Sequence, residues 1–399
     1  MKKKIIIIIT SLLLSMIIIF LSFKIYNYLR IKYAKIEVIL KEDLTAEFNE
    51  KKKISDYITS INGNIINDEY IDTTVVGNKD VTFKFINEDN IKVSYTYQIE
   101  IKDTVEPLIW LGNSYSVPVN SDIKLEEKIL CGDNYDNNPN CYIEGEYNLN
   151  EVGSYPLVFK AIDSSGNTEE VEFTLNVYEP KKGTTSTSKK INTDFNDVIK
   201  NYKNDDTKIG IDVSSWQGDI DFEKLKASGV EFIMIRVGGT KGTNGEYFLD
   251  KKFKQNIEDA NKYGIDAGVY FYSYANSVES AIDDAKWVLK QVKNYKIDLP
   301  IAFDWEEWSS FNEYNLSFFK LTSIAEAFLK TVEDAGYQGM LYSSKAYLEK
   351  IWLETDYDIW LAHYTSQTNY TGKYKMWQLC DNGKVDGISG NVDIDIMYK

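Results

Sequence analysis

The chain has 399 residues, of which 61 are acidic and 45 basic, giving a formal net charge of −16 at pH 7. At roughly 150 residues per domain this length predicts two or three domains. The shares of hydrophobic (43%) and charged (27%) residues exclude wholesale disorder. The negative charge argues against a nucleic-acid partner, which normally requires a basic face. His363 is the only histidine, so most catalytic triads and histidine-ligated metal sites are excluded. Carboxylates remain as candidates for chemistry.

The first 35 residues favour a transmembrane helix. Three lysines, at positions 2 to 4, precede an uncharged run of 19 residues from Ile5 to Phe23. A helix of this length nearly crosses a hydrocarbon core of about 30 Å. No small-x-small cleavage motif follows it, so we expect an uncleaved signal anchor, with cleavage and secretion as the alternative. Residues 1–35 would then be a cytoplasmic stub and one membrane span, with the rest of the chain outside the cell.

Residues 36–180 show the alternation of apolar and polar residues that is typical of β-strands, separated by Asn, Asp and Gly turns. The region matches itself at an offset of 76, for example Phe83-Lys84 with Phe159-Lys160. This internal repeat predicts two β-sandwiches, at 36–104 and 105–180. The second copy resembles bacterial immunoglobulin-like modules, through Ala161–Asn167 and its closing Val177–Pro180.

The three cysteines and the following polar segment complete the N-terminal half. Cys131 and Cys141 either form a local disulfide or remain free, because export permits the bond without requiring it. Cys380 is expected to be a small buried hydrophobic residue. Residues 181–206 are expected to be a polar linker.

From 207 to 399 apolar strands alternate with helical segments, which predicts parallel strands covered by helices. We therefore expect a compact, irregular β/α barrel as the C-terminal domain. Its strands are expected at 208–213, 232–237, 267–272, 300–305, 339–343, 358–364, 374–379 and 392–398.

Acidic residues mark the ends of three of these strands. In a parallel barrel the reactive groups lie at the carboxyl ends of the strands, where this chain places Asp212, Asp304, Glu306 and Asp393. Asp304 and Glu306 are two residues apart, so on a strand they would project from one face. Two carboxyls this close raise the pKa of one of them. One protonated and one ionised carboxyl is what glycosidic cleavage requires.

Other interpretations of these residues stay open. Asp212 alone could cap a helix, and the four acids could hold calcium or magnesium. Residues 133–138 look like a calcium loop but lack its glycine and distal glutamate, so a turn is expected. Arg236 would either pair with an acid of the site or bind a helix end.

Aromatic residues near the strand ends are candidates for stacking on sugar rings. We expect Tyr272, Tyr342 and Tyr364 to line a saccharide groove, with plain core packing as the alternative. His363 alternates with that face and is expected to point outward.

Seven ordered motifs between 208 and 399 resemble those of glycoside hydrolase family 25, the muramidases also called Chalaropsis-type lysozymes. The resemblance implies an irregular β/α barrel that hydrolyses the β-1,4 bond from N-acetylmuramic acid to N-acetylglucosamine. The motifs are Gly210–Gly218, Phe232–Gly238, Gly268–Tyr272, Phe303–Glu306, Ile359–Ala362, Met376–Gln378 and Gly390–Asp393.

Carried over by position, the resemblance makes Glu306 the general acid and base and Asp304 its partner, with Asp212 and Asp393 as further site acids. Gln378 is expected to bind substrate. Retention of configuration is implied, by either a covalent or a substrate-assisted route. The chain departs from the family at Asp395, commonly Asn, and at Phe271, often His.

The sequence thus predicts a single-pass cell-membrane muramidase whose catalytic domain faces the wall and needs no metal or organic cofactor. Its expected partners are peptidoglycan strands, the membrane and surface proteins that bind the two sandwiches. The alternative from another class is a non-catalytic peptidoglycan-binding or scaffold protein of the cell surface.

Overall fold

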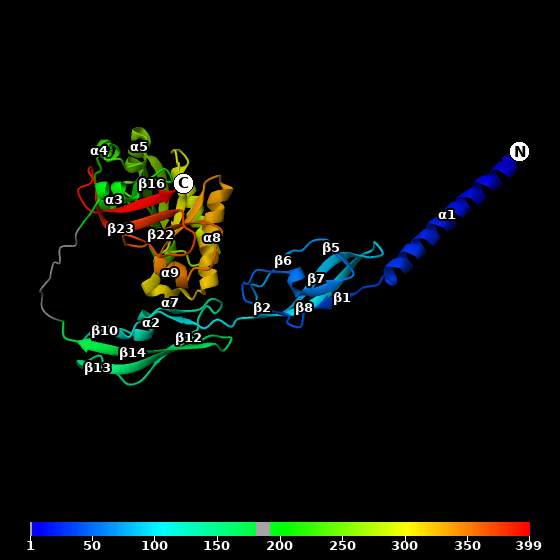
Figure 1. Ribbon diagram of the computed structural model, residues 1–399, viewed down its shortest axis with the longest axis horizontal. Coiled ribbons are helices and arrows are strands. Elements are labelled where there is room, and N and C mark those ends of the chain that lie inside the picture. The colour runs from blue at the N-terminus through cyan, green and yellow to red at the C-terminus, as the bar shows by residue number, and fades with distance from the viewer. Residues whose placement is uncertain (1, 181–191) are drawn as a thin grey trace. The chain divides into compact units, whose positions relative to one another are not determined.

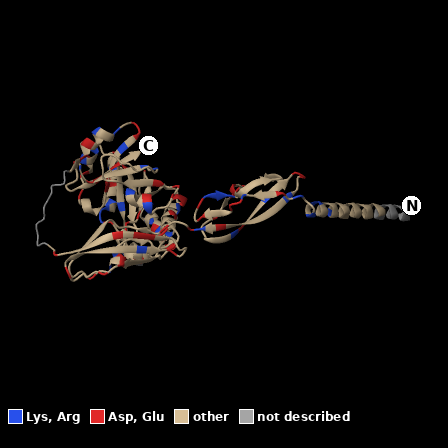
Figure 2. Ribbon diagram, turned by 60° about the horizontal axis from the view of Figure 1, so that its bottom comes forward, with Lys and Arg blue, Asp and Glu red and all other residues tan. Residues whose placement is uncertain are grey.

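The computed structural model describes residues 2–180 and 192–399, with side chains from residue 11 onward except that of Asn244 (Figure 1). The described chain divides into two compact units, residues 1–104 and 105–399. Acidic and basic residues are interspersed along the β-sheet part of the first unit and along the second unit (Figure 2).

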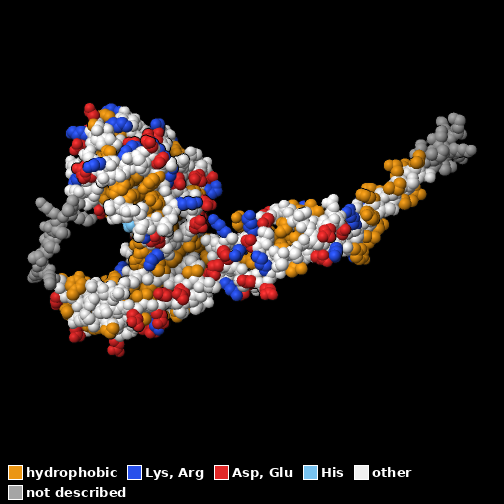
Figure 3. Space-filling model, in the orientation of Figure 1, with side chains coloured by type: hydrophobic (Ala, Val, Ile, Leu, Met, Phe, Trp, Pro, Cys, Tyr) orange, Lys and Arg blue, Asp and Glu red, His pale blue; other side chains and the backbone are white. Residues whose placement is uncertain are grey.

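The first unit opens with helix α1 (Lys2–Lys32). Its stretch Ser11–Lys32 is long and apolar enough to cross a membrane, a test that a signal sequence also passes. Hydrophobic side chains of this stretch are exposed along the helix (Figure 3). The predicted apolar helix is therefore present.

The rest of the first unit is built from short strands around one long hairpin. Alternate residues of β7, including Val81, Phe83 and Phe85, are buried in its core, as the period-2 pattern predicts. The sheets have the orders β2-β8-β7-β5, β1-β4 and β3-β6. The elements are β1 (Val38–Leu40), β2 (Thr45–Glu47), β3 (Lys52–Lys53), η1 (Ile54–Tyr57), β4 (Ile58–Ile61), β5 (Gly63–Ile65), β6 (Tyr70–Ile71), β7 (Gly77–Asn87) and β8 (Lys92–Lys102).

The second unit begins with another all-β module, which we call the β module (residues 105–178). Its hairpin β13–β14 starts 76 residues after the hairpin β7–β8, at Gly153 against Gly77, which is the offset of the sequence repeat. The sheets have the orders β10-β14-β13-β12 and β11-β9. The elements are β9 (Leu108–Ile109), β10 (Ser114–Pro118), α2 (Leu125–Lys128), β11 (Cys131–Gly132), β12 (Asn140–Glu144), β13 (Gly153–Ile162) and β14 (Thr168–Tyr178).

The structure shows how the cysteines pair and how the chain folds after Cys131. Cys131 and Cys141 form a disulfide, whereas Cys380 is free and buried. Residues 133–136 form a turn, because Asp133 Oδ1 accepts hydrogen bonds from the backbone N–H groups of Tyr135 and Asp136.

The remainder of the second unit is the predicted barrel. Eight strands form a ring in the order β16-β17-β19-β20-β21-β22-β23-β24, closed by pairing of β24 with β16. The strands are β16 (Thr207–Val213), β17 (Phe232–Thr240), β19 (Asp266–Tyr272), β20 (Ile301–Asp304), β21 (Gly339–Ser344), β22 (Asp358–Ala362), β23 (Met376–Lys384) and β24 (Val392–Tyr398). All eight predicted strands are therefore confirmed, with ends shifted by a few residues.

Helices cover the outside of the ring, and apolar side chains fill both sides of the sheet. Inside the ring, Phe232, Ala302 and Trp360 belong to one small core cluster. The helices and short elements are α3 (Phe195–Tyr202), η2 (Ser215–Gln217), α4 (Phe222–Ala227), η3 (Gly242–Asn244), β18 (Tyr247–Leu249), α5 (Phe253–Tyr263), α6 (Val278–Val292), η4 (Trp308–Ser310), α7 (Phe311–Tyr314), α8 (Phe318–Asp334) and α9 (Lys345–Lys350).

The direction of the last strand differs from that of the other strands in the ring. β24 is antiparallel to both β23 and β16, because the short connection from β23 leaves no room for a crossover helix. The beginning of β24 therefore lies at the edge where the parallel strands end, and Asp393 pairs in register with Asp212.

The expectation that residues 181–206 form a linker is wrong for the second half of this segment. β15 (Thr193–Asp194) pairs with β23, and α3 follows it directly. Phe195 and Val198 of α3 are buried in the barrel core, so this segment is part of the barrel. Residues 181–191 lie outside the described residues.

Candidate active site

A cleft of about 310 Å³ opens at the carboxyl edge of the barrel strands. It brings together all eight side chains that the sequence singled out: four acids, three tyrosines and Gln378. The lining residues are Asp212, Trp216, Arg236, Tyr270, Tyr272, Asp304, Glu306, Tyr342, Trp360, Tyr364, Gln378 and Asp393.

The central carboxyl pair is built by strand β20 and the loop after it. Asp304 is the last residue of β20, and only 4% of it is exposed. Within the described residues its Oδ1 has no hydrogen-bond partner. Glu306 lies two residues beyond the strand and is exposed, so the expectation that both residues sit on the strand is wrong. The strand ends because the chain turns toward η4 after Trp305, whose ring is fully buried.

The electrostatics of this pair favour protonation. Burial, followed by the charges of Glu306 and Asp212, holds the pKa of Asp304 well above its usual range. Loss of water around the Glu306 carboxyl within the cleft, followed by the charge of Glu307, raises the pKa of Glu306. Because each carboxylate repels the charge of the other, the pair loses its two protons in separate steps, which allows one carboxyl to be protonated while the other is ionised.

Gln378 of β23 organises the other side of the cleft. Its Oε1 accepts hydrogen bonds from the hydroxyls of Tyr342 (2.9 Å) and Tyr364 (3.1 Å), and its Nε2 donates to Asp212 Oδ2 (2.7 Å). Both ends of the amide are used, which fixes its orientation. Tyr364 nevertheless stays 53% exposed, leaving part of its ring available to a ligand.

Asp212 and Asp393 are the acids contributed by the paired strands β16 and β24. Burial, followed by the charge of Asp395, raises the pKa of Asp212. Burial, followed by the charge of Asp212, raises the pKa of Asp393 to about 8. None of the helices in the described part of the chain is capped by Asp212, since Ser214 caps η2 and Asp221 caps α4. The helix-cap interpretation of Asp212 is therefore wrong.

Asp395 lies beneath this group and was noted from sequence only as a departure from the family pattern. It is completely buried, and its Oδ1 accepts a hydrogen bond from Trp360 Nε1 at 2.9 Å. Burial raises its pKa well above the usual value. The folded protein therefore keeps a proton on Asp395 that the unfolded chain releases, and stability falls as the pH rises above about 4.

We predict that Asp395→Asn stabilises the protein more at pH 8 than at pH 5. The neutral amide removes the cost of holding the proton, by about 1 kcal/mol for each unit of pKa shift. Thermal unfolding at the two pH values measures the difference, with the exposed surface variant Asp358→Asn as the control. An equal effect at both pH values would contradict the buried-proton interpretation.

Two further residues line the cleft: Trp216, which the sequence analysis did not assign to the site, and Arg236, which it expected to pair with a site acid or with a helix end. Trp216 of η2 is 84% exposed at the cleft, a position where a sugar ring can stack. Arg236 also lines the cleft, but its guanidinium binds Asp250 at 2.7 Å, outside the predicted acid set. Its partner was invisible in the sequence because Asp250 lies beyond β18, on a loop whose path the pattern does not specify. His363 lies outside the cleft lining, and its Nδ1 contacts Thr368 Oγ1 at 2.9 Å.

Paired carboxyls at the carboxyl edge of a closed β/α barrel are an arrangement that glycoside hydrolases use. Comparison with known proteins agrees with this class. A sequence model of glycosyl hydrolases family 25 matches residues 211–388. The chain is 30% identical over 192 residues to the uncharacterized protein YegX of Escherichia coli K12, covering 47% of this chain and 68% of YegX. The chain belongs to glycosyl hydrolase family 25.

Two further comparisons are with cell-wall lytic proteins. The autolytic lysozyme of Clostridium acetobutylicum is 29% identical over 189 residues, covering 47% of this chain and 54% of that protein. The modular autolysin LytC of Streptococcus pneumoniae, solved with a synthetic peptidoglycan ligand, aligns with a TM-score of 0.43 and 27% identity, covering 60% of this chain and 56% of LytC. The chain thus spans about half the length of these two proteins.

Proposed function

We propose that the protein is a peptidoglycan muramidase that hydrolyses the β-1,4 bond between N-acetylmuramic acid and N-acetylglucosamine. The observation that carries the proposal is the gathering of Asp304 and Glu306, with Asp212 and Asp393, in one cleft at the barrel's carboxyl edge. The lysozyme and autolysin relatives of this family support peptidoglycan as the substrate.

In the proposed reaction Glu306 is the general acid. It donates its proton to the glycosidic oxygen as the bond from that oxygen to C1 of N-acetylmuramic acid breaks. Asp304, buried beside it, stabilises the positive charge that develops on the sugar. Glu306, now ionised, then takes a proton from the water that adds to C1, which restores the starting state. Substrate contacts are assigned to Tyr272, Tyr342, Tyr364 and Gln378.

Glu307 tunes this acid. Its Oε1 accepts a hydrogen bond from the Tyr272 hydroxyl at 3.1 Å, and its charge raises the pKa of Glu306. Glu307→Gln keeps an acceptor for Tyr272 but removes the charge. The pKa of Glu306 should fall, so the alkaline limb of the pH–rate profile should move to lower pH. Glu313→Gln, an exposed change on α7, should leave the profile where it is; an unmoved profile in Glu307→Gln would contradict the assignment.

The apolar helix of the N-terminal half supports a proposal for where this activity takes place. We infer that α1 anchors the chain in the cell membrane as a single span and that the catalytic domain faces the cell wall. The proposed domains are 36–104 and 105–180, both immunoglobulin-like sandwiches, and a catalytic barrel that begins with β15 at Thr193. The sandwiches would hold the barrel away from the bilayer and offer surfaces to other surface proteins.

The proposal is tested with the full chain in detergent and purified peptidoglycan. Release of reducing ends and retention of protein on the insoluble wall are measured in the same samples. Hydrolysis, detected as new reducing ends, is the expected result. Binding without any release of reducing ends would make the barrel a wall-binding module instead.

A further inference from the structure

We propose that the β module is a positioning element of the active site, and not only a spacer. This inference rests on the proposed muramidase function. The segment that it holds is residues 305–317, which we call the catalytic loop. This loop contains Glu306 and ends immediately before α8. Hydrogen bonds at two places, close packing at Gly132 and a chain of aromatic rings connect the β module with this loop and with α8.

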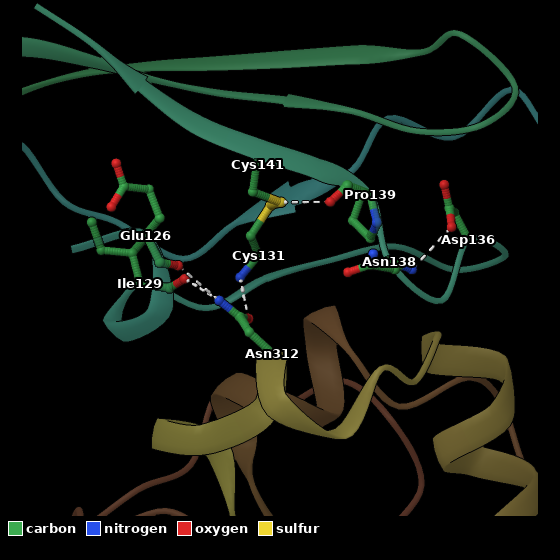
Figure 4. The surroundings of a disulfide bond; sticks show 8 residues. All are labelled: Glu126, Ile129, Cys131, Asp136, Asn138, Pro139, Cys141 and Asn312. Carbon is green, nitrogen blue, oxygen red and sulfur yellow. Dashed lines mark hydrogen bonds between the residues drawn. A yellow bond between two sulfur atoms is a disulfide. The ribbon is translucent and has the colours of Figure 1, made fainter. Parts of the chain in front are cut away.

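The first contact is made by the side chain of Asn312, from α7 (Figure 4). Its Nδ2 donates to the backbone oxygens of Glu126 (3.0 Å) and Ile129 (2.9 Å), and its Oδ1 accepts from the Cys131 N–H (3.0 Å). One amide thus satisfies three backbone groups of the β module. Removing it would leave those groups without their partners at a half-buried interface.

The second contact is at the start of α8. The first N–H groups of a helix have no partner within the helix. Here the Phe318 N–H donates to the backbone oxygen of Asp133 (2.8 Å), and the Phe319 N–H donates to the backbone oxygen of Asn134 (3.2 Å). The Ser317 N–H donates to Asn137 Oδ1 (3.2 Å). A turn of the β module therefore caps the helix that ends the catalytic loop.

The interface is also closely packed at Gly132. A Cβ atom added there would lie 2.7 Å from Cε1 of Phe318 and 2.8 Å from Cε1 of Phe311. Leu130, two residues earlier, is buried within the barrel's own core cluster. The β module and the catalytic loop therefore share one apolar core.

The last connection is a chain of aromatic rings that leads to the catalytic pair. Trp110 of the β module lies 4.8 Å from the ring of Tyr347, which stacks on Trp308 at 3.9 Å. Trp308 in turn lies 4.8 Å from Trp305, the fully buried residue between Asp304 and Glu306. A displacement of the β module would therefore be transmitted to the backbone that carries Glu306.

The disulfide lies at the centre of this arrangement. Cys131 and Cys141 join the two ends of the segment that supplies the Asp133 and Asn134 oxygens, and the Cys131 N–H itself binds Asn312. The bond limits the freedom of that segment, so its loss should weaken the hold on the catalytic loop.

The test uses the full chain with Asn312→Ala and Gly132→Ala, each assayed well below its unfolding temperature. The matched control is Gly112→Ala, in the same β module, where an added Cβ meets nothing within 4 Å. We expect kcat to fall about tenfold or more with KM changed less than twofold, since small displacements of catalytic groups reduce rate more than binding. Gly112→Ala should keep the wild-type values.

A second readout does not depend on turnover. Hydrogen exchange of residues 305–319 should accelerate in Asn312→Ala, in Gly132→Ala and on reduction of the disulfide, but not in Gly112→Ala. If both variants unfold at lower temperature yet keep wild-type kcat and slow exchange in this loop, the β module only adds stability and the proposal is overturned. If the wild type itself releases no reducing ends, the proposed function fails, while the exchange result still decides whether the loop is held.

Discussion

Glu306→Gln should lower the rate of reducing-end release from peptidoglycan by about a thousandfold, within the range that a positioned general acid contributes. The amide has nearly the shape of the carboxyl but cannot give a proton to the leaving oxygen. Because Glu306 lies in the loop after β20 and is exposed to the cleft, the fold should tolerate the change. The measurement is kcat on purified peptidoglycan, with circular dichroism to check that the variant is folded.

Glu313→Gln provides the control for this prediction. It makes the same chemical change at an exposed position of α7, outside the cleft lining. The control should keep wild-type kcat. Retention of more than about a tenth of the activity by Glu306→Gln would assign the acid role to another residue.

Asp304→Asn should reduce kcat by about a hundredfold or more while KM changes little. Asp304 is buried, and its Oδ1 has no hydrogen-bond partner among the described residues, so the carboxyl is free to act on the substrate. Its negative charge is valuable only when positive charge develops on the sugar, so the loss should appear in the transition state. Steady-state kinetics on soluble glycan fragments separate the two parameters.

The surface variant Asp358→Asn is the control for Asp304→Asn, since it removes an exposed carboxyl at the first residue of β22, two strands away from β20 in the sheet. A loss confined to KM in Asp304→Asn would mean that this carboxyl only binds the substrate. Its assignment as the stabiliser of charge would then be withdrawn.

The sequence predicted the barrel well because its signals are local. Each strand is a short apolar run bounded by turn residues, and period-2 burial follows directly from the geometry of strands. The same logic located the acids: an aspartate that ends an apolar strand must lie at the carboxyl edge, as Asp212 and Asp304 do. Tyr272 and Tyr342 followed because they occupy strand positions near the same edge, whereas Tyr364 lies in the loop two residues beyond the end of β22.

Features that depend on distant contacts were not predictable. No local pattern indicates that Arg236 binds Asp250, or that α3 buries Phe195 in the barrel. The hydrogen bonds between Asn312 and the β module join residues more than 180 positions apart in the sequence. A single asparagine on a short helix carries no periodic signal, so only the three-dimensional arrangement reveals its role.

Glu306, in this assignment, drives hydrolysis at C1 of N-acetylmuramic acid. The most direct measurement is digestion of peptidoglycan in H₂¹⁸O by wild type and Glu306→Gln, with immediate borohydride reduction and mass spectrometry of the products. Wild type should place one ¹⁸O on reduced N-acetylmuramic acid, and Glu306→Gln should yield almost none. Label on reduced N-acetylglucosamine, or unlabelled anhydro-sugar ends, would contradict the assignment.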